Sequence, residues 1–303
     1  MLSPHHLLLL LLLAPPTASF YASLPPLPPL PSSPLVVKYG GNAMTSPELA
    51  KLFCEDAAFL RSAGVPLVVV HGGGPMITRL LGELAIPSSF DPETGVRVSD
   101  EPTVRAASYA LGAVNKNLAS AISAAPSPCA AVGLDGRDAR LLRCRRQDER
   151  LGNVGVVEVV NAGFLKGLVD AKLLPVISPI GAALEDGDDT IFNVNADAAA
   201  GAVAVAVGSP GTIFLTDISG VLDASKKLLP TLTPAQVDAL IEDGTIAGGM
   251  IPKVRMAVEA AAGGGKAVIA DGRKEHALVR EVYKLLGAEM DVGGGGEGGT
   301  TIG

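Results

Sequence analysis

Short, uninterrupted apolar runs alternate along the chain with longer segments in which apolar residues recur every three or four positions. Uninterrupted runs are typical of strands buried on both faces, as in a parallel sheet, whereas the longer spacing is typical of helices that bury one face. This alternation predicts an α/β fold. Strands are predicted at 35–39, 66–71, 174–180, 212–216 and 266–270. Helices are predicted at 46–63, 75–85, 103–123, 161–172, 195–207, 234–243, 250–263 and 274–286.

Two segments follow a different pattern. Residues 90–99 and 139–160 alternate apolar and polar positions, which predicts β-hairpins inserted between the strand–helix units. The chain finishes in "GGGGEGGTTIG", a glycine-rich stretch that we expect to lead into a short edge strand. Many of the 36 glycines lie in short clusters between apolar runs, as tight strand-to-helix turns require.

The first 34 residues are expected to lie outside the fold. The leucine run in "HHLLLLLLLAPPTASF" is too short to span a bilayer and resembles a signal-peptide core, with a cleavage point after Ser19. The next piece, "YASLPPLPPLPSSP", lacks acidic residues and resembles a plastid transit segment reached through the secretory route. We therefore expect a plastid protein with no membrane segment in its mature form; a secreted protein is the alternative. Proline should prevent a regular helix before residue 35.

Composition narrows the function classes. The net charge of −7 argues against a nucleic-acid partner, which would need a basic patch. Cys54, Cys129 and Cys144 are odd in number and widely spaced, so they predict neither a disulfide framework nor a metal site. Packed, reduced thiols favour an organelle interior over the outside of the cell.

Two predicted strands lead into glycine-rich turns. "LVVKYGGNAM" places Lys38 at the end of the first strand, just before Gly40 and Gly41. "HGGGP", residues 71–75, follows the second strand and opens a helix. Such turns let backbone N–H groups approach an anion, although most glycine turns are only tight connections. The lysine at the strand end makes a phosphorylated ligand the better interpretation.

Two further clusters contain polar residues near predicted helix starts. In "FNVNAD", Asn193 and Asn195 alternate on an extended segment, and Asp197 follows. One of them is expected to cap the next helix, but three polar residues in five positions also suggest a binding site. In "GTIAGGMIPK", Lys253 lies just inside a helix, where a cation is unfavourable unless it meets an anion or extends into solvent.

These pieces together resemble the N-acetyl-L-glutamate kinases, a branch of the amino-acid kinase family. The resemblance implies a three-layer αβα sandwich around a mainly parallel sheet, with an N-terminal lobe at 35–208 and a C-terminal lobe at 209–303. The matching pieces, in family order, are "KYGGNAM", "VVVHGGGP", "TGVRVSD", "VNKNL", "VGLDGRD", "LGNVGVVEVVN", "LPVISPIG", "FNVNADAAAG", "LTDISGVLD", "LIEDGTIAGGMIPKV" and "ADGRKEHALVRE".

The resemblance also implies a role for each matching residue. Lys38 and Lys253 would stabilise the phosphoryl group in transfer, and Asp197 would orient both lysines. The substrate, N-acetyl-L-glutamate, would be bound by Gly73, Gly74, Arg97, Asn193 and Asn195. ATP would be bound by Gly40, Gly41, Asp217, Ile218, Ser219, Gly220, Val221, Leu222, Thr245, Ile246 and Ala247. We expect no metal site made of protein ligands, with Mg²⁺ held through the ATP phosphates.

Regulation and assembly rest on the same resemblance. His276 and Glu281 keep the spacing of the arginine site in arginine-inhibited members, so arginine is expected as a feedback inhibitor. In those members a short glycine-containing turn follows at the C-terminus, and here a glycine-rich stretch lengthens the segment between Glu281 and Thr300. We expect a homodimer rather than a hexamer, because the segment before Leu35 is rich in proline. The PII nitrogen-signalling protein is a further expected partner.

Three functions compete. The first is phosphorylation of the γ-carboxylate of N-acetyl-L-glutamate in arginine biosynthesis. The second is another kinase of the same fold, acting on glutamate, aspartate, carbamate or UMP. The third is a non-catalytic arginine or nitrogen sensor on the same scaffold, which would tolerate the loss of Lys38, Asp197 or Lys253. All three of these residues are present.

Overall fold

The computed structural model describes residues 16–44, 46–288 and 298–303. Within these residues, eleven strands form one sheet with the order β4-β5-β7-β6-β2-β1-β8-β10-β11-β9, and β3 pairs with β6. The centre, from β6 through β2, β1 and β8 to β10, is parallel. The strands are β1 (Leu35–Tyr39), β2 (Leu67–His71), β3 (Ala130–Gly136), β4 (Leu142–Arg146), β5 (Val154–Val160), β6 (Leu173–Ala183), β7 (Ile191–Val194), β8 (Gly211–Thr216), β9 (Thr231–Leu232), β10 (Lys266–Asp271) and β11 (Thr300–Ile302).

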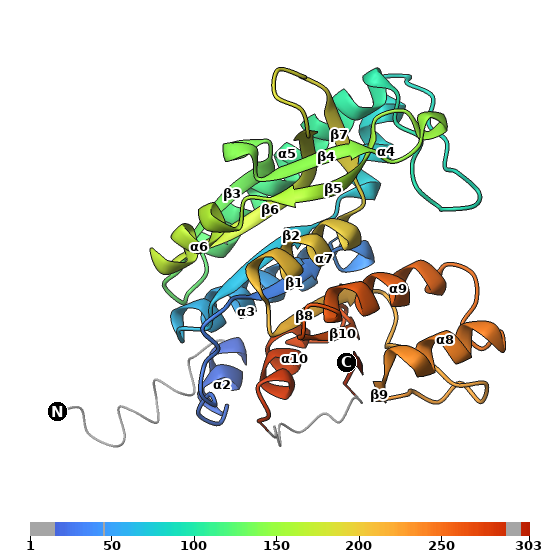
Figure 1. Cartoon of the computed structure of the whole chain (residues 1–303). Coiled ribbons are helices and arrows are strands. Elements are labelled where there is room, and N and C mark those ends of the chain that lie inside the picture. The colour runs from blue at the N-terminus through green and yellow to red at the C-terminus, as the bar shows by residue number, and fades with distance from the viewer. Residues whose placement is uncertain (1–15, 45, 289–297) are drawn as a thin grey trace.

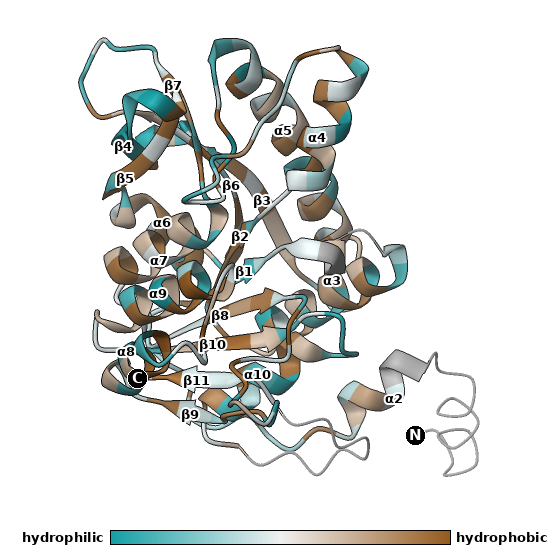
Figure 2. Ribbon diagram, turned by 90° about the vertical axis from the view of Figure 1, so that its right-hand side faces the viewer, coloured by the Kyte–Doolittle hydropathy of each residue, from teal (hydrophilic) through white to brown (hydrophobic). Residues whose placement is uncertain are grey.

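Helices cover both faces of this sheet (Figures 1 and 2). One face carries α3 (Pro47–Ser62), α5 (Glu101–Ser123) and α10 (Ala277–Leu285), and the other carries α6 (Ala162–Asp170), α7 (Ala196–Val207) and α9 (Met250–Ala261). The three-layer αβα arrangement is therefore confirmed. Towards the two ends of the molecule lie α4 (Gly74–Glu83) and α8 (Pro234–Glu242). Among the described helices, none is both long and apolar enough to span a bilayer.

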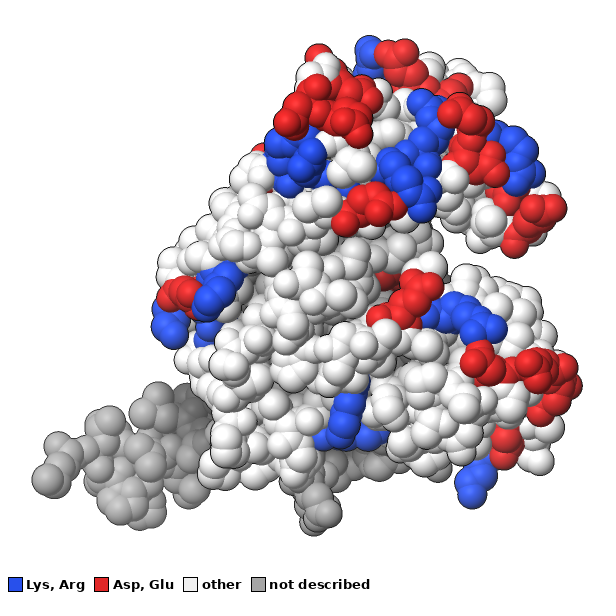
Figure 3. Space-filling view, viewed as in Figure 1, with Lys and Arg blue, Asp and Glu red and all other residues white. Residues whose placement is uncertain are grey.

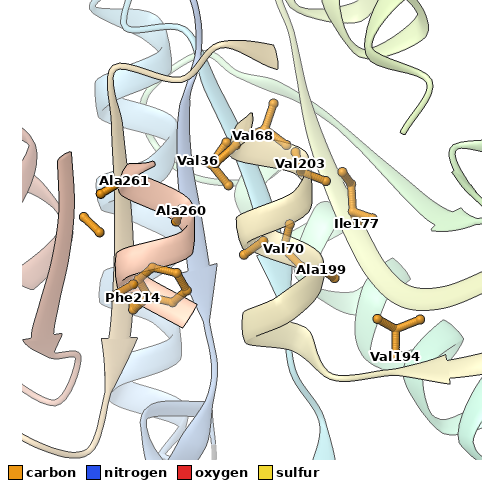
Figure 4. Close-up of a cluster of buried hydrophobic side chains, with 14 of the residues drawn as sticks. Val36, Val68, Val70, Ile177, Val194, Ala199, Val203, Phe214, Ala260 and Ala261 are labelled. Carbon is orange, nitrogen blue, oxygen red and sulfur yellow. The ribbon is translucent and has the colours of Figure 1, made fainter. Parts of the chain in front are cut away.

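Successive side chains of the central strands point to opposite faces of the sheet and contribute to two separate hydrophobic cores. Val36, Val68 and Val70 point to the face of α7, where they pack with residues of α7 and α9 (Figure 4). Leu35 and Val37 point to the opposite face and pack against α3 and α10. Because both faces are buried, the strands need apolar residues at successive positions, which explains the uninterrupted runs. Lys38 shares its face with Val36, so its side chain lies on the α7 side of the sheet.

Most predicted elements are confirmed with small shifts at their ends. The hairpin expected within 139–160 is present as antiparallel β4 and β5. Residues 90–99 form no named strand, but an isolated antiparallel bridge joins Phe90 to Arg97, and a second bridge joins Ser99 to Gly152. The sequence pattern did not predict β3, whose segment "AAVGLDG" contains two glycines and is partly exposed. The C-terminal strand exists as β11, but it pairs with both β10 and β9 and is not an edge strand. The glycine run at 289–297 lies outside the described residues.

The N-terminal segment differs from expectation. Residues Pro16–Ala22 form the helix α2, because proline stands only at its first position and the remaining six residues contain none. The phenol of Tyr21 donates a hydrogen bond to Asp56 on α3 at 2.8 Å, and the Tyr283 hydroxyl donates to the Pro25 carbonyl at 3.1 Å. The expectation that proline prevents a regular helix is thus wrong, and the part of the segment from α2 onward packs on the fold. A targeting role for residues 1–34 stays a prediction.

The C-terminal strand holds the loop that follows β8. The buried hydroxyl of Thr300 accepts a hydrogen bond from the Val221 N–H at 2.8 Å and donates to the Leu229 carbonyl at 2.7 Å. A side chain at Gly220 would clash with Thr300, and Gly220 has a φ of 136° that favours glycine. The last residues of the chain therefore fix the position of residues 220–229.

Thr300→Val should destabilise the protein by about 1–3 kcal/mol, because an isosteric methyl leaves the buried Val221 N–H without its acceptor. Chemical denaturation with far-ultraviolet circular dichroism measures this change. The half-buried Thr301 offers a matched control, and Thr301→Val should be close to neutral. Equal stability of both variants would show that the loop does not depend on Thr300.

Candidate active site

Parallel pairing brings two glycine turns to the same edge of the sheet. Tyr39 is in register with His71, so β1 and β2 end side by side. The Gly72 N–H donates to the Tyr39 carbonyl at 2.8 Å, which ties the second turn to the first. A Cβ atom on Gly40 would lie 2.7 Å from the Lys38 ammonium nitrogen, so only glycine leaves room for that lysine here. Gly41 adopts a φ of 72°, in the left-handed region.

Lys38 is buried and paired. Its ammonium nitrogen lies 3.0 Å from the carboxylate of Asp197 in the first turn of α7. Asn195 caps that helix, because its side-chain oxygen accepts hydrogen bonds from the N–H groups of Asp197 and Ala198 at 2.8 and 3.2 Å. The capping interpretation of Asn195 is therefore confirmed, and a contact of Asn195 with substrate stays a prediction.

Lys253 reaches the neighbouring strand. From α9, its ammonium group donates a hydrogen bond to the Thr216 hydroxyl at 2.9 Å, and Thr216 donates to Asp217 at 3.1 Å. Burial opposes ionisation of Asp217, but this hydrogen bond and the charges of Lys253 and Arg273 lower its pKa overall. Asp197 was expected to orient both lysines. The structure shows its ion pair with Lys38 and places Lys253 on Thr216.

Arg97 lies beside the second glycine turn. Its guanidinium donates to the Thr78 hydroxyl at 2.7 Å, approaches the Gly74 carbonyl at 3.5 Å, and also contacts Ser88. The Phe90 ring covers it, with 4.4 Å from the guanidinium carbon to the ring centroid. A buried guanidinium held in this way keeps a fixed orientation relative to the start of α4.

Asn193 joins the same group through Ser99. Its amide donates to the Ser99 hydroxyl at 3.1 Å, and that hydroxyl donates to the Arg97 carbonyl at 2.9 Å. The backbone N–H of Asn193 donates to the Asn153 carbonyl at 2.9 Å. The structure therefore brings Gly74, Arg97 and Asn193 together, although they are far apart in sequence.

The two segments expected to hold a nucleotide lie on the C-terminal side. The first follows β8, and its Asp217 backbone N would lie 3.9 Å from a Cβ atom on Gly41, so the segment borders the first glycine turn. The second connects α8 to α9, where Thr245 N–H donates to Asp243 at 2.9 Å. Buried Val221 and Ile246 belong to the same hydrophobic cluster, which positions both segments.

In the space-filling view of Figure 3, a hollow separates the part of the molecule that carries β4, β5 and α4 from the part that carries α8 and α9; the elements are labelled in the same view in Figure 1. A different cavity of about 700 Å³ lies between α3, α4 and α5. It is lined mostly by apolar side chains and reaches Gly73, but it includes none of Lys38, Asp197 and Lys253, so we do not assign phosphoryl transfer to it. The two lysines and the two glycine turns could instead stabilise adjacent anions at the carboxyl edge of the sheet.

Sequence reasoning missed the hydroxyl groups that hold the charged residues. Thr216 fixes Lys253, Thr78 and Ser88 fix Arg97, and Ser99 links Arg97 to Asn193. A weak signal exists for two of them. Thr216 immediately precedes Asp217 at a strand end, and Ser99 lies inside the "TGVRVSD" piece.

His276 and Glu281 lie on the α10 side and contact different elements. His276 is hydrogen-bonded to Asp56 at 2.7 Å, and its ring stacks on Phe20 with centroids 3.7 Å apart. Burial raises the pKa of Asp56, and hydrogen bonds from His276 and Tyr21 oppose this in part. Glu281 accepts the Gly299 N–H at 2.8 Å, next to β11.

Curated relatives are similar over most of the chain. The acetylglutamate kinase of Rhizorhabdus wittichii is 44% identical over 275 residues, which cover 86% of this chain and 89% of that protein. The acetylglutamate kinase of Neisseria meningitidis is 39% identical over 275 residues, covering 88% of this chain and 90% of that protein.

Solved structures share the fold at lower identity. The N-acetylglutamate synthase of Neisseria gonorrhoeae, complexed with coenzyme A and L-arginine, aligns with a TM-score of 0.72 and 23% identity. That alignment covers 89% of this chain and 61% of the synthase chain. The carbamate kinase of Giardia lamblia bound to AMP-PNP aligns with a TM-score of 0.60 and 18% identity over 89% of this chain and 98% of that one.

The family model described as the amino acid kinase family matches residues 33–271, a span that runs from β1 through β10 and includes both lysines, both glycine turns and Arg97. Together with the relatives above, this match shows that the chain belongs to the amino acid kinase family.

Proposed function

We propose that this protein transfers the γ-phosphoryl group of ATP to the γ-carboxylate of N-acetyl-L-glutamate, a step of arginine biosynthesis. The observation that carries the proposal is that Lys38 lies against the first glycine turn, which is tied to the second, while Arg97 is held beside the second turn. Relatives named acetylglutamate kinase, at 39–44% identity over most of the chain, support the choice of acceptor. Glutamate, aspartate, carbamate and UMP are the alternative acceptors within the same fold.

The proposed reaction needs no general base. A carboxyl group with a pKa of about 4.3 is ionised near neutral pH, so a carboxylate oxygen can attack the γ-phosphorus directly. The bond from that phosphorus to the β–γ bridging oxygen breaks, and the electron pair leaves on ADP. The difficulty is repulsion between two anions, which cations and backbone N–H groups offset. Lys38 extends from the end of β1, and Lys253 extends from α9 and is held by Thr216 at the end of the neighbouring strand β8.

The residues present fit a magnesium nucleotide. Gly40 lets the Lys38 ammonium group lie against the first glycine turn, and Gly41 borders Asp217, so a phosphate chain at this turn would meet a cation. Mg²⁺ held by the ATP phosphates would supply further positive charge at the transferring group. Asp217, whose pKa is lowered, carries a negative charge beside Lys253 at neutral pH.

We also propose a homodimer, import into a plastid directed by residues 1–34, and contact with the PII nitrogen-signalling protein. Because α2 forms before Leu35, proline content no longer argues against a hexamer, and a hexamer in solution would contradict the first of these proposals. The dimer is measured by light scattering of the purified chain. Import is measured by fusing residues 1–34 to a fluorescent protein, and secretion of that fusion would contradict it. Co-elution with a PII protein in gel filtration tests the third proposal.

The reaction is tested with the full chain and a coupled assay for ADP. N-acetylglutamate, glutamate, aspartate, carbamate and UMP are compared as acceptors at equal concentration. Turnover with N-acetylglutamate at least tenfold above the others supports the proposal. Preference for another acceptor would place the enzyme in a different branch, and no ADP release with any of them would favour the sensor.

Lys38→Ala and Lys253→Ala should each lower kcat by about 10²–10³, because removing one preorganised donor costs about 2.7–4 kcal/mol of transition-state stabilisation. The KM values should change less, since the charge that these lysines meet is largest during transfer. Lys166, exposed and paired with Asp170 on α6, supplies the control Lys166→Ala. A kcat near the wild-type value in either test variant would contradict the assignment.

Arg97→Lys should raise the KM for N-acetylglutamate about tenfold or more while leaving the KM for ATP nearly unchanged. A lysine ammonium cannot reproduce the planar guanidinium, which contacts Thr78 and Ser88 and can bind a carboxylate through two N–H groups. The exposed Arg105, paired with Glu101, gives the matched control Arg105→Lys. If only the KM for ATP rises, Arg97 serves the nucleotide instead.

Arginine should inhibit the enzyme, and Glu281→Gln should weaken this inhibition at least tenfold with kcat unchanged. One carboxylate oxygen of Glu281 holds the Gly299 N–H, while the other is buried and has no hydrogen-bond partner among the described residues. Glutamine keeps an oxygen for Gly299 but removes the charge that a guanidinium would meet. Arginine titration in the ADP assay measures the effect, and a flat response up to several millimolar in the wild type would refute arginine feedback.

A further inference from the structure

His71 is buried at the end of β2, directly before the glycine turn, and has none of its side chain exposed to solvent. Burial lowers the pKa of His71 to about 4, so its ring is neutral at neutral pH. A neutral imidazole has one N–H donor and one acceptor nitrogen, and its neighbours decide which is which. The proposed reaction does not use this ring, so its role must be sought in what it contacts.

The contacts of His71 define its tautomer. Nδ1 lies 2.7 Å from the Gly72 carbonyl oxygen, which can only accept, so Nδ1 carries the proton. Nε2 lies 3.1 Å from the side-chain nitrogen of Asn115 on α5 and accepts a hydrogen bond from it. The same Asn115 nitrogen donates its second proton to the Val176 carbonyl of β6 at 2.9 Å. Each proton in this series of hydrogen bonds therefore has an acceptor.

Asn115 is itself enclosed. It is buried, and a Cβ atom on Gly133 of β3 would lie 2.4 Å from its side-chain oxygen, so a larger residue at position 133 would displace the amide. The Asn115 side chain thus spans from α5 to β6 and presses against β3. A ring held by such a partner cannot rotate without breaking buried hydrogen bonds.

The peptide between Gly72 and Gly73 is consequently fixed. The Gly72 N–H donates to the Tyr39 carbonyl, and the Gly72 carbonyl accepts from His71. In a trans peptide, the carbonyl and the following N–H point in opposite directions. Because the Gly72 carbonyl points toward the His71 ring, the Gly73 N–H points away from that ring. Glycines have no side chain to restrain such a turn, so the restraint has to come from outside it.

We propose that His71, held by Asn115, is a positioning residue that aims the Gly73 N–H at the acceptor carboxylate. The inference deepens the proposed function and rests on its placement of that carboxylate at Gly73 and Gly74. Asn115 belongs to the helix that starts at Glu101, just after Arg97 and Ser99. The hydrogen bonds of His71 and Asn115 therefore also fix the position of the glycine turn relative to the Arg97 guanidinium, which in the proposed function binds the other end of the acceptor.

The two hydrogen bonds of the ring can be separated by a matched pair of variants. In His71→Asn, the side-chain amide nitrogen can occupy the place of Nδ1 and still donate to the Gly72 carbonyl. In His71→Gln, the longer side chain reaches the place of Nε2 and can accept from Asn115, but it leaves the Gly72 carbonyl without its donor. Both variants exchange a neutral ring for a neutral amide, so a purely structural role would affect them alike.

We expect His71→Gln to lower kcat/KM for the acceptor by about 10²-fold, with the KM for ATP nearly unchanged, since mis-aiming one donor resembles losing it. His71→Asn should recover at least tenfold of that loss. Exposed Asn117, two residues after Asn115, gives the control Asn117→Ala, which should match the wild type. Equal kcat/KM values for the Asn and Gln variants, or a rise in the KM for ATP alone, would overturn the proposal.

A second measurement does not depend on activity or on folding of the variants. Nitrogen-15 NMR of the histidine-labelled full chain should show a neutral His71 ring with its proton on Nδ1 at pH 7. A proton on Nε2, or a charged ring, would overturn the positioning role even if the enzyme phosphorylates N-acetylglutamate. Absence of turnover by the wild type with this acceptor, together with the expected tautomer, would instead refute the proposed function alone.

Discussion

The burial of the Lys38 ammonium group at the end of β1 constrains its whole neighbourhood. An unpaired cation in this environment would be costly, and Asp197 meets it at 3.0 Å. Asp197 can do so only because α7 starts at this point, and Asn195 fixes that start by capping the helix. Gly40 leaves the space that the ammonium group occupies. The buried charge of Lys38 therefore links the end of β1, the first glycine turn and α7, which lies far from β1 in the sequence.

The two lysines are supported differently. Lys38 extends from a central strand with neighbours on both sides, so its backbone moves little relative to β2 and β8. Lys253 extends from α9, which contacts the sheet through one face, and a single hydroxyl at the end of β8 holds its ammonium group. The first cation belongs to the rigid core, and the position of the second depends on how α9 packs.

Patterns of apolar residues were sufficient to predict the strands that are buried on both faces, because such strands need uninterrupted runs of apolar residues. They failed for β3, where Gly133 makes room for Asn115 and the two glycines weaken the strand pattern, and for residues 90–99, where isolated bridges replace a hairpin. Lys38 could be named as a candidate from the sequence, since a lysine at the end of a buried strand is costly unless an anion meets it, whereas Arg97 was named only through the family resemblance. The hydroxyl partners of the charged residues could not be named, because Thr216, Thr78, Ser88 and Ser99 are common residues whose role emerges only once distant segments meet.

The continuous sheet has a mechanical consequence for the two lobes predicted at 35–208 and 209–303. The β1–β8 ladder crosses the boundary between them, with Val36 paired to Thr212 and Tyr39 to Leu215. A free hinge at this boundary would have to break those hydrogen bonds, so the lobes can separate only as far as the sheet can twist elastically. Larger displacements are left to segments outside the ladder, namely the loop that carries Arg97 and the helices α8 and α9. Under the proposed function, ligand entry on either side of Lys38 would then be a local event, and the edge of the sheet that holds Lys38 would stay assembled.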